Sequence, residues 1–347
     1  MAYDFELGES ARTLVKDIME IEEDENVVIT ADTNSSEEVI KATANEVFTA
    51  GGKPMVVKNA TPEGVGKAAD EMLPQKTLTG ALKEADAWIE FNQQWLLYST
   101  PFDIVIEENQ FIRYICLVEM NPDMMVRTIG RVDMPLLAEF LEKIAKRTGK
   151  ANEVRVTTPA GTDLKFENHP EREMIVHSGE VIPGKSAMLP GQISWSPKFE
   201  TINGTLVFDG SLVPPTGLLD TPIEMTIEKG KVVNIEGGTE AQKFKNWLES
   251  FDDENMYQLA HISYGFNPGA KLTGNIVEDE RIWGGTEWGI GNVGSKLVPE
   301  QEGGIEASSH CDGICTNSSV WLDGEQVMDE GTIVNFPELK ELEKELK

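Results

Sequence analysis

Three side chains, His261, His310 and Asp312, have the types and the spacing of a metal site. His310 and Asp312 stand two positions apart, so on an extended segment both side chains point to one face and can bind one ion. His261 lies in Ala260-His-Ile-Ser-Tyr-Gly-Phe-Asn-Pro268, which has the pattern of a strand passing into a loop. Together they would form a triad of two imidazoles and one carboxylate. Such a triad leaves three positions of an octahedral ion open, which suits Fe(II).

The same residues allow a simpler interpretation. A histidine and an aspartate at this spacing are common, and His261 could cap a turn without meeting the other two. Imidazole and carboxylate also bind Mn, Co and Zn, so the donor types alone do not select iron. Glu287, in Gly285-Thr-Glu-Trp-Gly-Ile-Gly291, could be an extra ligand, a general base or a structural glutamate.

The segments that carry these residues resemble those of a known enzyme family. Leu259-Ala-His-Ile-Ser-Tyr-Gly-Phe-Asn-Pro-Gly-Ala-Lys-Leu-Thr273 and Ser309-His-Cys-Asp-Gly313 look like the iron-binding segments of 2,5-dihydroxypyridine 5,6-dioxygenases. The similarity covers most of residues 150 to 335. It implies that the two histidines and the aspartate bind ferrous iron. It also implies that the reaction is the oxidative cleavage of a hydroxylated aromatic or N-heteroaromatic ring.

The resemblance is weaker where the substrate would bind. Tyr98, in Gln94-Trp-Leu-Leu-Tyr-Ser-Thr-Pro101, stands where that family carries a substrate-contacting histidine, and the region around Ala187 lacks a second one. A phenol with a pKa near 10 is a poorer base than imidazole at neutral pH, although it can donate a proton. We expect Tyr98 and Glu287 to be the residues that handle protons.

The C-terminal half is also distantly similar to the aminopeptidase T (M29) metallopeptidases, whose two-metal site uses two Glu, two His and one Asp. By alignment, Gln192 and His261 stand in place of the two glutamates, and Glu287 stands in place of a histidine. A hydrolytic two-metal site needs a bridging carboxylate, so Gln192 argues against peptide hydrolysis, although Glu287 could compensate. A metallo-aminopeptidase is the second hypothesis. A catalytically silent binding protein that keeps the fold is the third.

The elements that must position these residues fall into two predicted domains. In residues 1 to 150, short apolar strands such as Asn26–Thr30 and Pro54–Lys58 alternate with helical segments, which is the order of a Rossmann-like parallel α/β sheet. The amphipathic segment Met134–Lys146 predicts the last helix of this domain. In residues 151 to 347, short alternating strands between Gly and Pro turns predict a larger, mostly antiparallel α+β domain that carries the metal site.

Two further motifs give no prediction of a cofactor. Gly289-Ile-Gly-Asn-Val-Gly294 fits the dinucleotide glycine string only in form, because no convincing strand precedes it and no helix follows. His177 and Glu180 could reach a substrate from a loop, but such a histidine is more often a solvated turn residue. A divalent metal is therefore the cofactor that the sequence predicts.

The composition excludes several partners. With 30 Lys and Arg against 60 Asp and Glu, the formal net charge is −30, and such a surface repels nucleic acid and anionic membranes. No run approaches the ~20 apolar residues of a membrane-spanning helix, the first residues are acidic, and the three cysteines form no CxxC pair. We expect a cytoplasmic enzyme with a small-molecule substrate. The resemblance implies that it forms homo-oligomers.

Overall fold

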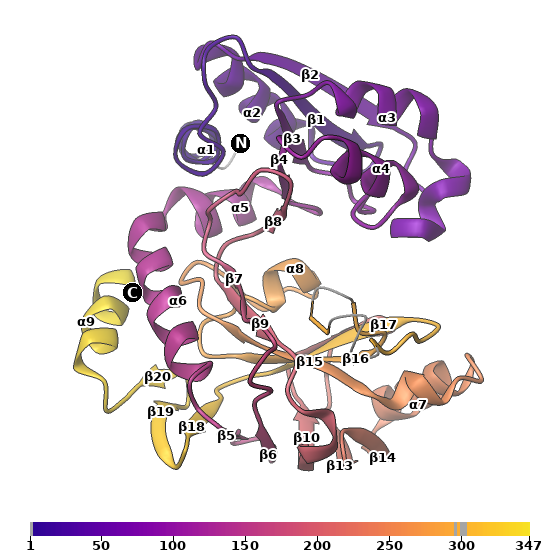
Figure 1. Cartoon of the computed structure of the whole chain (residues 1–347), viewed down its shortest axis with the longest axis vertical. Helices are drawn as coiled ribbons and strands as arrows, with labels where there is room; N and C mark the ends of the chain where they lie inside the picture. The colour runs from indigo at the N-terminus through magenta and orange to yellow at the C-terminus, as the bar shows by residue number, and fades with distance from the viewer. Residues whose placement is uncertain (1–2, 295–296, 299–303) are drawn as a thin grey trace. The chain divides into compact units, whose positions relative to one another are not determined.

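The computed structural model describes residues 3–294, 297–298 and 304–347, and the chain divides into two compact units (Figure 1). Unit 1 comprises Met1–Met134 and Gly179–Pro190, and unit 2 comprises Pro135–Ser178 and Gly191–Lys347. Within the described residues, no helix is both long enough and apolar enough to cross a membrane.

The units differ from the predicted domains in two segments. The predicted helix is present as α6 (Met134–Thr148), but nearly all of it belongs to unit 2. The segment 179–190 returns to unit 1 because it contains β8 (Ser186–Met188), which pairs in parallel with β4 (Arg113–Cys116). This pairing joins residues about 70 positions apart in the chain, so local patterns do not reveal it.

Unit 1 contains a five-stranded parallel sheet, sheet A, in the order β2-β1-β3-β4-β8. Its interior strand β1 is buried along almost its whole length, as expected for a parallel sheet. This confirms the predicted α/β class. The other elements of the unit are β1 (Asn26–Asp32), β2 (Lys53–Asn59), β3 (Ala87–Glu90), α1 (Asp4–Arg12), α2 (Glu37–Thr49), α3 (Gln75–Lys83), α4 (Thr100–Glu108) and α5 (Pro122–Met125).

Unit 2 contains two antiparallel sheets, which confirms the predicted α+β class. Sheet B has the order β14-β13-β10-β6-β5-β18-β19-β20, and sheet C has the order β12-β11-β17-β16-β15-β9-β7. The strands of sheet B are β5 (Glu153–Thr157), β6 (Asp163–Glu167), β10 (Asn203–Phe208), β13 (Ile223–Glu228), β14 (Lys231–Gly237), β18 (Ser319–Leu322), β19 (Glu325–Asp329) and β20 (Thr332–Ile333). The strands of sheet C are β7 (Ile175–His177), β9 (Gln192–Trp195), β11 (Ser211–Val213), β12 (Gly217–Leu218), β15 (Leu259–Gly265), β16 (Thr286–Gly291) and β17 (His310–Cys315). The helices that follow or connect these strands are α7 (Thr239–Glu249), α8 (Ile276–Asp279) and α9 (Pro337–Leu346).

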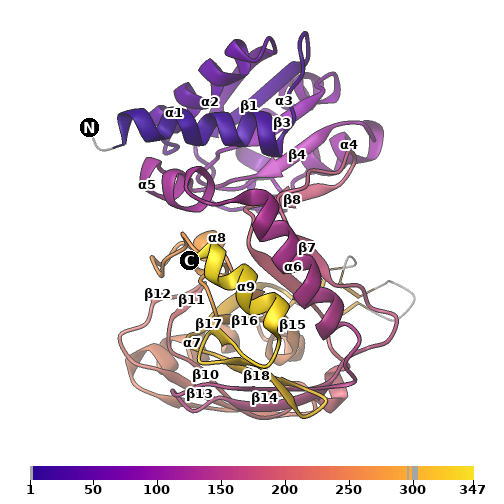
Figure 2. The same cartoon turned by 90° about the vertical axis from the view of Figure 1, so that its left-hand side faces the viewer.

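Sheets B and C lie against each other in unit 2 (Figure 2), and aromatic side chains pack between them. Phe166 of β6 meets Trp288 of β16 edge to face, with ring centroids 5.5 Å apart. Gly313 of β17 makes room for Phe208 of β10, because a Cβ at Gly313 would lie 2.1 Å from the Phe208 ring. One face of sheet C is therefore committed to the core, and the chemistry must lie on the other.

A buried carboxyl group lies at the carboxyl end of β3 in unit 1. Glu90 is fully buried, and it accepts hydrogen bonds from the Leu96 N–H and from the Tyr114 hydroxyl. Burial raises the pKa of Glu90 to about 7, although both hydrogen bonds act in the opposite direction. The folded state therefore holds a proton on Glu90 at pH values where the unfolded chain has released it.

We expect Glu90→Gln to remove a pH-dependent loss of stability. Since the pKa of Glu90 is higher in the folded state, its contribution is complete below pH ~4.5 and is lost as the pH rises through about 7. Between pH 5 and pH 8, the wild type should lose about 2.5 kcal/mol of unfolding free energy relative to Glu90→Gln. Urea unfolding at four pH values measures this, with the exposed Glu84→Gln as the control. A constant difference between wild type and Glu90→Gln would contradict the assignment.

Candidate metal centre

One face of sheet C is polar where its central strands lie side by side. Side chains alternate along a strand, and directly paired residues of antiparallel neighbours share a face. Gly289 of β16 is paired with His261 of β15 and with Asp312 of β17, so these two side chains flank a glycine. The same face carries Gln192 and Ser194 of β9, Ser263 of β15, Glu287 of β16 and His310 of β17.

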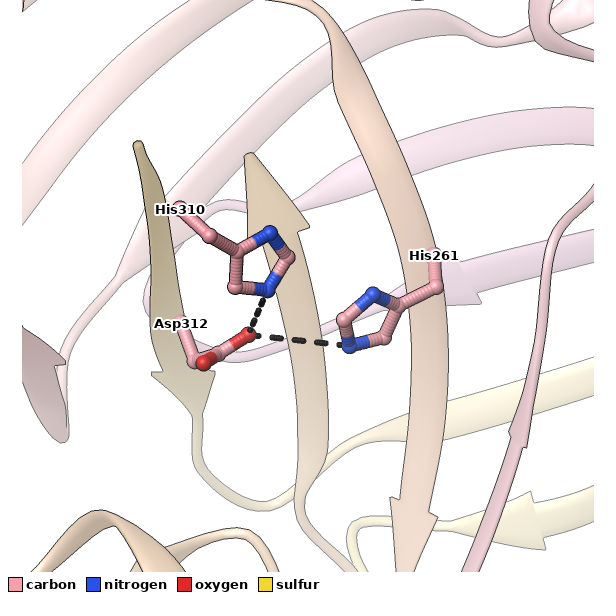
Figure 3. A group of neighbouring side chains, drawn as sticks. All are labelled: His261, His310 and Asp312. Atoms are coloured by element: carbon pink, nitrogen blue, oxygen red, sulfur yellow. Dashed lines mark hydrogen bonds and ion pairs between the residues drawn. The ribbon is translucent and has the colours of Figure 1, made fainter. Parts of the chain in front are cut away.

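The structure brings the three predicted ligands together (Figure 3). One nitrogen or oxygen atom of each of His261, His310 and Asp312 lies within 4.8 Å of the others. The Oδ1 atom of Asp312 is 2.9 Å from His310 Nε2 and 3.6 Å from His261 Nε2. The two imidazole rings are nearly parallel, with an interplanar angle of 12° and centroids 5.2 Å apart. As predicted, His310 and Asp312 point to the same face of an extended strand. Cys311, which lies between them in the sequence, is buried on the opposite face.

Two backbone features create this arrangement. The pairing of β15 with β16 shifts by one residue between Leu259 and His261, and such bulges re-aim side chains near functional sites. The shift places His261 directly opposite Gly289. A Cβ on Gly289 would lie 2.3 Å from His261 Cε1 and 2.8 Å from His310 Cε1. Real Cβ atoms essentially never come this close, so a larger residue at position 289 would displace at least one of the two rings.

The backbone also orients His310. Its Nδ1 lies 2.8 Å from the carbonyl oxygen of Asn292, which can only accept a hydrogen bond. Nδ1 therefore carries the proton, and Nε2 faces Asp312. A backbone carbonyl on one ring nitrogen is a common way to direct the other toward a metal ion.

Glu287 lies beside the triad in a buried position without hydrogen-bond partners. Its side chain is 1% exposed, and neither of its carboxyl oxygens makes a hydrogen bond of normal geometry to a described residue. His261 Nε2 is 2.9 Å from Glu287 Oε1 but is not aligned with it as a hydrogen bond. Burial, with the nearby charge of Asp312, raises the pKa of Glu287 well above its usual value. Burial therefore favours the neutral form of this carboxyl group in the metal-free protein.

Asp312 is held in its charged form. Burial opposes this, but the imidazoles of His310 and His261 outweigh burial and lower the pKa of Asp312 to about 2. For His310, burial disfavours the cation, yet the Asp312 carboxylate raises the pKa of the imidazole above its usual value. The metal-free site thus places one ion pair beside a carboxyl group for which burial favours the neutral form.

The donor set fits a divalent metal ion. Two imidazole nitrogens and a carboxylate oxygen converge, and the two buried oxygens of Glu287 have no partner among the described residues. Buried polar atoms without partners cost free energy, which a cation bound beside them would offset. His261 and Asp312 are 13% and 15% exposed and His310 is 32% exposed, so a substrate can reach an ion held there.

Gln192 lies on the same face but contacts another residue. Its Nε2 donates a hydrogen bond of 2.9 Å to Oε2 of Glu280, which also accepts one of 2.8 Å from Arg281 Nη1. Burial raises the pKa of Glu280 to about 7, Arg281 lowers it, and Asp312 and Glu287 raise it further. Gln192 therefore stands where the aminopeptidase alignment has a metal-binding glutamate, and its amide donates a hydrogen bond to the Glu280 carboxyl group.

The other residues that the sequence singled out are distributed over both units. Tyr98 is in unit 1, with its side chain 56% exposed, a φ of 66° and an edge contact to the Phe102 ring. His177 ends β7 on the polar face, opposite Gln192, whereas Glu180 belongs to unit 1. A role of Tyr98 in proton transfer stays a prediction.

Sequence reasoning missed two residues of this site. Glu280 stands in the acidic run 278–280 of a chain rich in acids, and no local signal distinguishes it. Gly289 stands out in the sequence as the first residue of the glycine string 289–294, but that pattern suggests only dinucleotide binding. In the structure, this first glycine leaves room for the imidazole rings of His261 and His310.

Comparisons with known proteins identify relatives of this chain. The sequence profile of the 2,5-dihydroxypyridine 5,6-dioxygenase family matches residues 13–335. The chain is 25% identical over 288 residues, 79% of each protein, to the 2,5-dihydroxypyridine 5,6-dioxygenase of Pseudomonas putida KT2440.

Two solved structures share the fold. The 2,5-dihydroxypyridine dioxygenase of Pseudomonas putida KT2440 has a TM-score of 0.77 at 19% identity, covering 96% of this chain and 98% of that one. Wild-type AmpT from Thermus thermophilus has a TM-score of 0.72 at 14% identity, covering 96% and 100%. The second similarity agrees with the distant resemblance to aminopeptidase T. Because the matching profile spans nearly the whole chain, this protein belongs to the 2,5-dihydroxypyridine 5,6-dioxygenase family.

Proposed function

We propose that this protein is a non-haem Fe(II)-dependent dioxygenase that cleaves the ring of a hydroxylated aromatic or N-heteroaromatic compound. The metal ligands in this proposal are His261, His310 and Asp312. The observation that carries it is the convergence of these three side chains on one face of sheet C, in a chain of this family.

The ligand set explains why iron is the proposed metal. Bound Fe(II) would supply adjacent open positions for dioxygen and for a chelating ring, and it would pass charge between them. The protein's part is to fix the ligands before the substrate arrives. Asn292 fixes the His310 ring through Nδ1, and Gly289 lets both rings lie over β16.

Proton handling is proposed for Glu287, with Tyr98 as the predicted second group. The Glu287 carboxyl is buried beside His261 and Asp312, and burial raises its pKa, which favours its protonated form. A neutral buried acid can give its proton to an oxygen of the substrate and take one back later. A phenol such as Tyr98 can donate a proton but is a weak base at neutral pH.

The hydrolase alternative is less well supported by the polar contacts. The fold is shared with AmpT, but the amide of Gln192 donates to Glu280 and has no negative charge to bridge two ions. A two-metal hydrolytic site needs such a bridge to hold its ions ~3.5 to 4 Å apart.

The direct test loads the protein with Fe(II) under anaerobic conditions. We expect about one iron per chain, measured by elemental analysis, and oxygen uptake when 2,5-dihydroxypyridine is added to the aerobic enzyme. His310→Ala should lose at least tenfold in iron affinity because it removes one of three ligands. His169→Ala, which removes a histidine outside the triad, is the matched control.

Two results would contradict the proposal. One is a wild-type protein that holds no iron and consumes no oxygen with any hydroxylated pyridine. The other is release of amino acids from short peptides by Zn- or Co-loaded protein with two metals per chain, which would favour the aminopeptidase.

Gly289→Ala should weaken metal binding without removing a ligand. The added methyl group would overlap both imidazole rings, so at least one must leave its position. Gly294→Ala is the matched control, because a Cβ there meets no atom within 4 Å. We expect Gly289→Ala to bind iron at least tenfold more weakly than Gly294→Ala, with similar circular dichroism spectra. Equal iron affinity of the two variants would rule out this role for Gly289.

A further inference from the structure

The segment that carries Glu280 lies over the same face of sheet C as the triad. Gly265 is the last residue of β15 and shares the face of His261 and Ser263, which lie four and two positions earlier. A Cβ on Gly265 would lie 2.7 Å from the carbonyl oxygen of Glu280 and 2.4 Å from that of Ile282. The backbone of residues 280–282 therefore rests directly on this face, and only a glycine permits it.

The carboxyl group of Glu280 is anchored through one oxygen only. Oε2 accepts both the Gln192 amide and the Arg281 guanidinium, which are 4% and 0% exposed. Oε1 makes no hydrogen bond to any described residue, and it is not among the buried atoms that lack a partner. With 14% of the side chain exposed, Oε1 is the atom that an incoming molecule can meet.

This anchoring differs from that of an ordinary ion pair. Two buried donors on one oxygen fix the carboxyl plane, so the second oxygen points in a defined direction at little further entropy cost. A carboxyl group that served only to neutralise Arg281 would gain more from binding its guanidinium with both oxygens. The arrangement instead leaves one acceptor open.

The distance along β15 suits a substrate that lies flat on the sheet. From His261 to Gly265 the strand advances about 13 Å, with Ser263 and the paired Glu287 between them. A ring that chelates a metal at the triad would extend over this middle row. The effect of Asp312 and Glu287 on the pKa of Glu280 agrees with a carboxyl group near that row.

We infer, on the basis of the proposed function, that Glu280 is a substrate-binding residue whose Oε1 accepts a hydrogen bond from an O–H or ring N–H remote from the metal. Gln192 and Arg281 are the positioning residues for this carboxyl group. The site then selects rings that chelate the metal at one end and carry a hydrogen-bond donor at the other. A ring without that donor leaves Oε1 facing an apolar edge.

The test measures binding of three probes to the Fe(II)-loaded protein by anaerobic calorimetry. The probes are 2,5-dihydroxypyridine, 2-hydroxypyridine and 3-hydroxypyridine, of which each of the last two lacks one hydroxyl group. Glu280→Ala should bind 2,5-dihydroxypyridine roughly 10- to 100-fold more weakly, the usual effect of losing a hydrogen bond to a charged group. The monohydroxylated probe that lacks the contacted donor should bind equally to wild type and variant.

Two further variants separate binding from folding. Gln192→Ala should weaken 2,5-dihydroxypyridine binding about threefold, because it frees the carboxyl group without removing it. Glu249→Gln, an exposed position on α7, should change nothing. Iron content should stay at the wild-type value in all three variants, since none removes a proposed ligand.

The outcomes are distinguishable. If Glu280→Ala weakens all three probes by the same factor, or weakens none, Glu280 does not contact the substrate and the inference fails while the proposed function stands. If the wild type holds no iron or binds none of the three pyridines, the proposed function fails and the inference fails with it.

Discussion

The crowding of two imidazoles and two carboxyl groups on one face of sheet C is the constraint on which the rest of the site depends. Asp312 is charged and paired with His310, whereas burial beside it favours the neutral form of Glu287. Two buried carboxylates this close would repel each other and lose several kcal/mol of solvation. A divalent cation would remove the conflict, because it attracts both carboxyl groups and offers the Glu287 oxygens a partner. Metal binding would also stabilise the fold, since the unfolded chain has no such site.

One face of sheet C packs in the core, and the other carries the polar side chains of the site. The face toward sheet B is apolar, and Phe166 and Phe208 pack against Trp288 and Gly313 there. Because this packing fixes the register of β15, β16 and β17, it also fixes the spacing of the polar side chains on the other face. A slip of one residue would turn His261 and Asp312 into the core. The bulge before His261 and the glycines at 265 and 289 then supply local room for two rings and for the segment 280–282.

Much of the fold and the ligand set could be predicted from the sequence. The strand around residues 153–157 and the helix near 134–146 have clear periodic patterns, and the structure contains both. His310 and Asp312 could be paired because alternation along a strand is a local rule. His261 joins them through the pairing of β15 with β16. The family resemblance indicated that His261 belongs to the same site, whereas the spacing along the chain did not.

What could not be predicted depends on non-local pairing. The return of β8 to sheet A is set by contacts with β4, and no pattern within residues 179–190 encodes it. Glu280 reaches the polar face only because its backbone crosses Gly265, and the requirement for glycine at 289 follows from two rings carried by other strands. Such residues become visible only when the register of all strands is known.

The measurement that tests the central claim most directly is X-ray absorption spectroscopy of the anaerobic Fe(II)-loaded protein at the iron edge. We predict a mononuclear, six-coordinate spectrum with two imidazole ligands, the remaining ligands being oxygens of carboxylate and water. A spectrum without imidazole scattering would contradict the triad. A second metal ion at ~3.5 to 4 Å would contradict the mononuclear site and favour a hydrolytic centre.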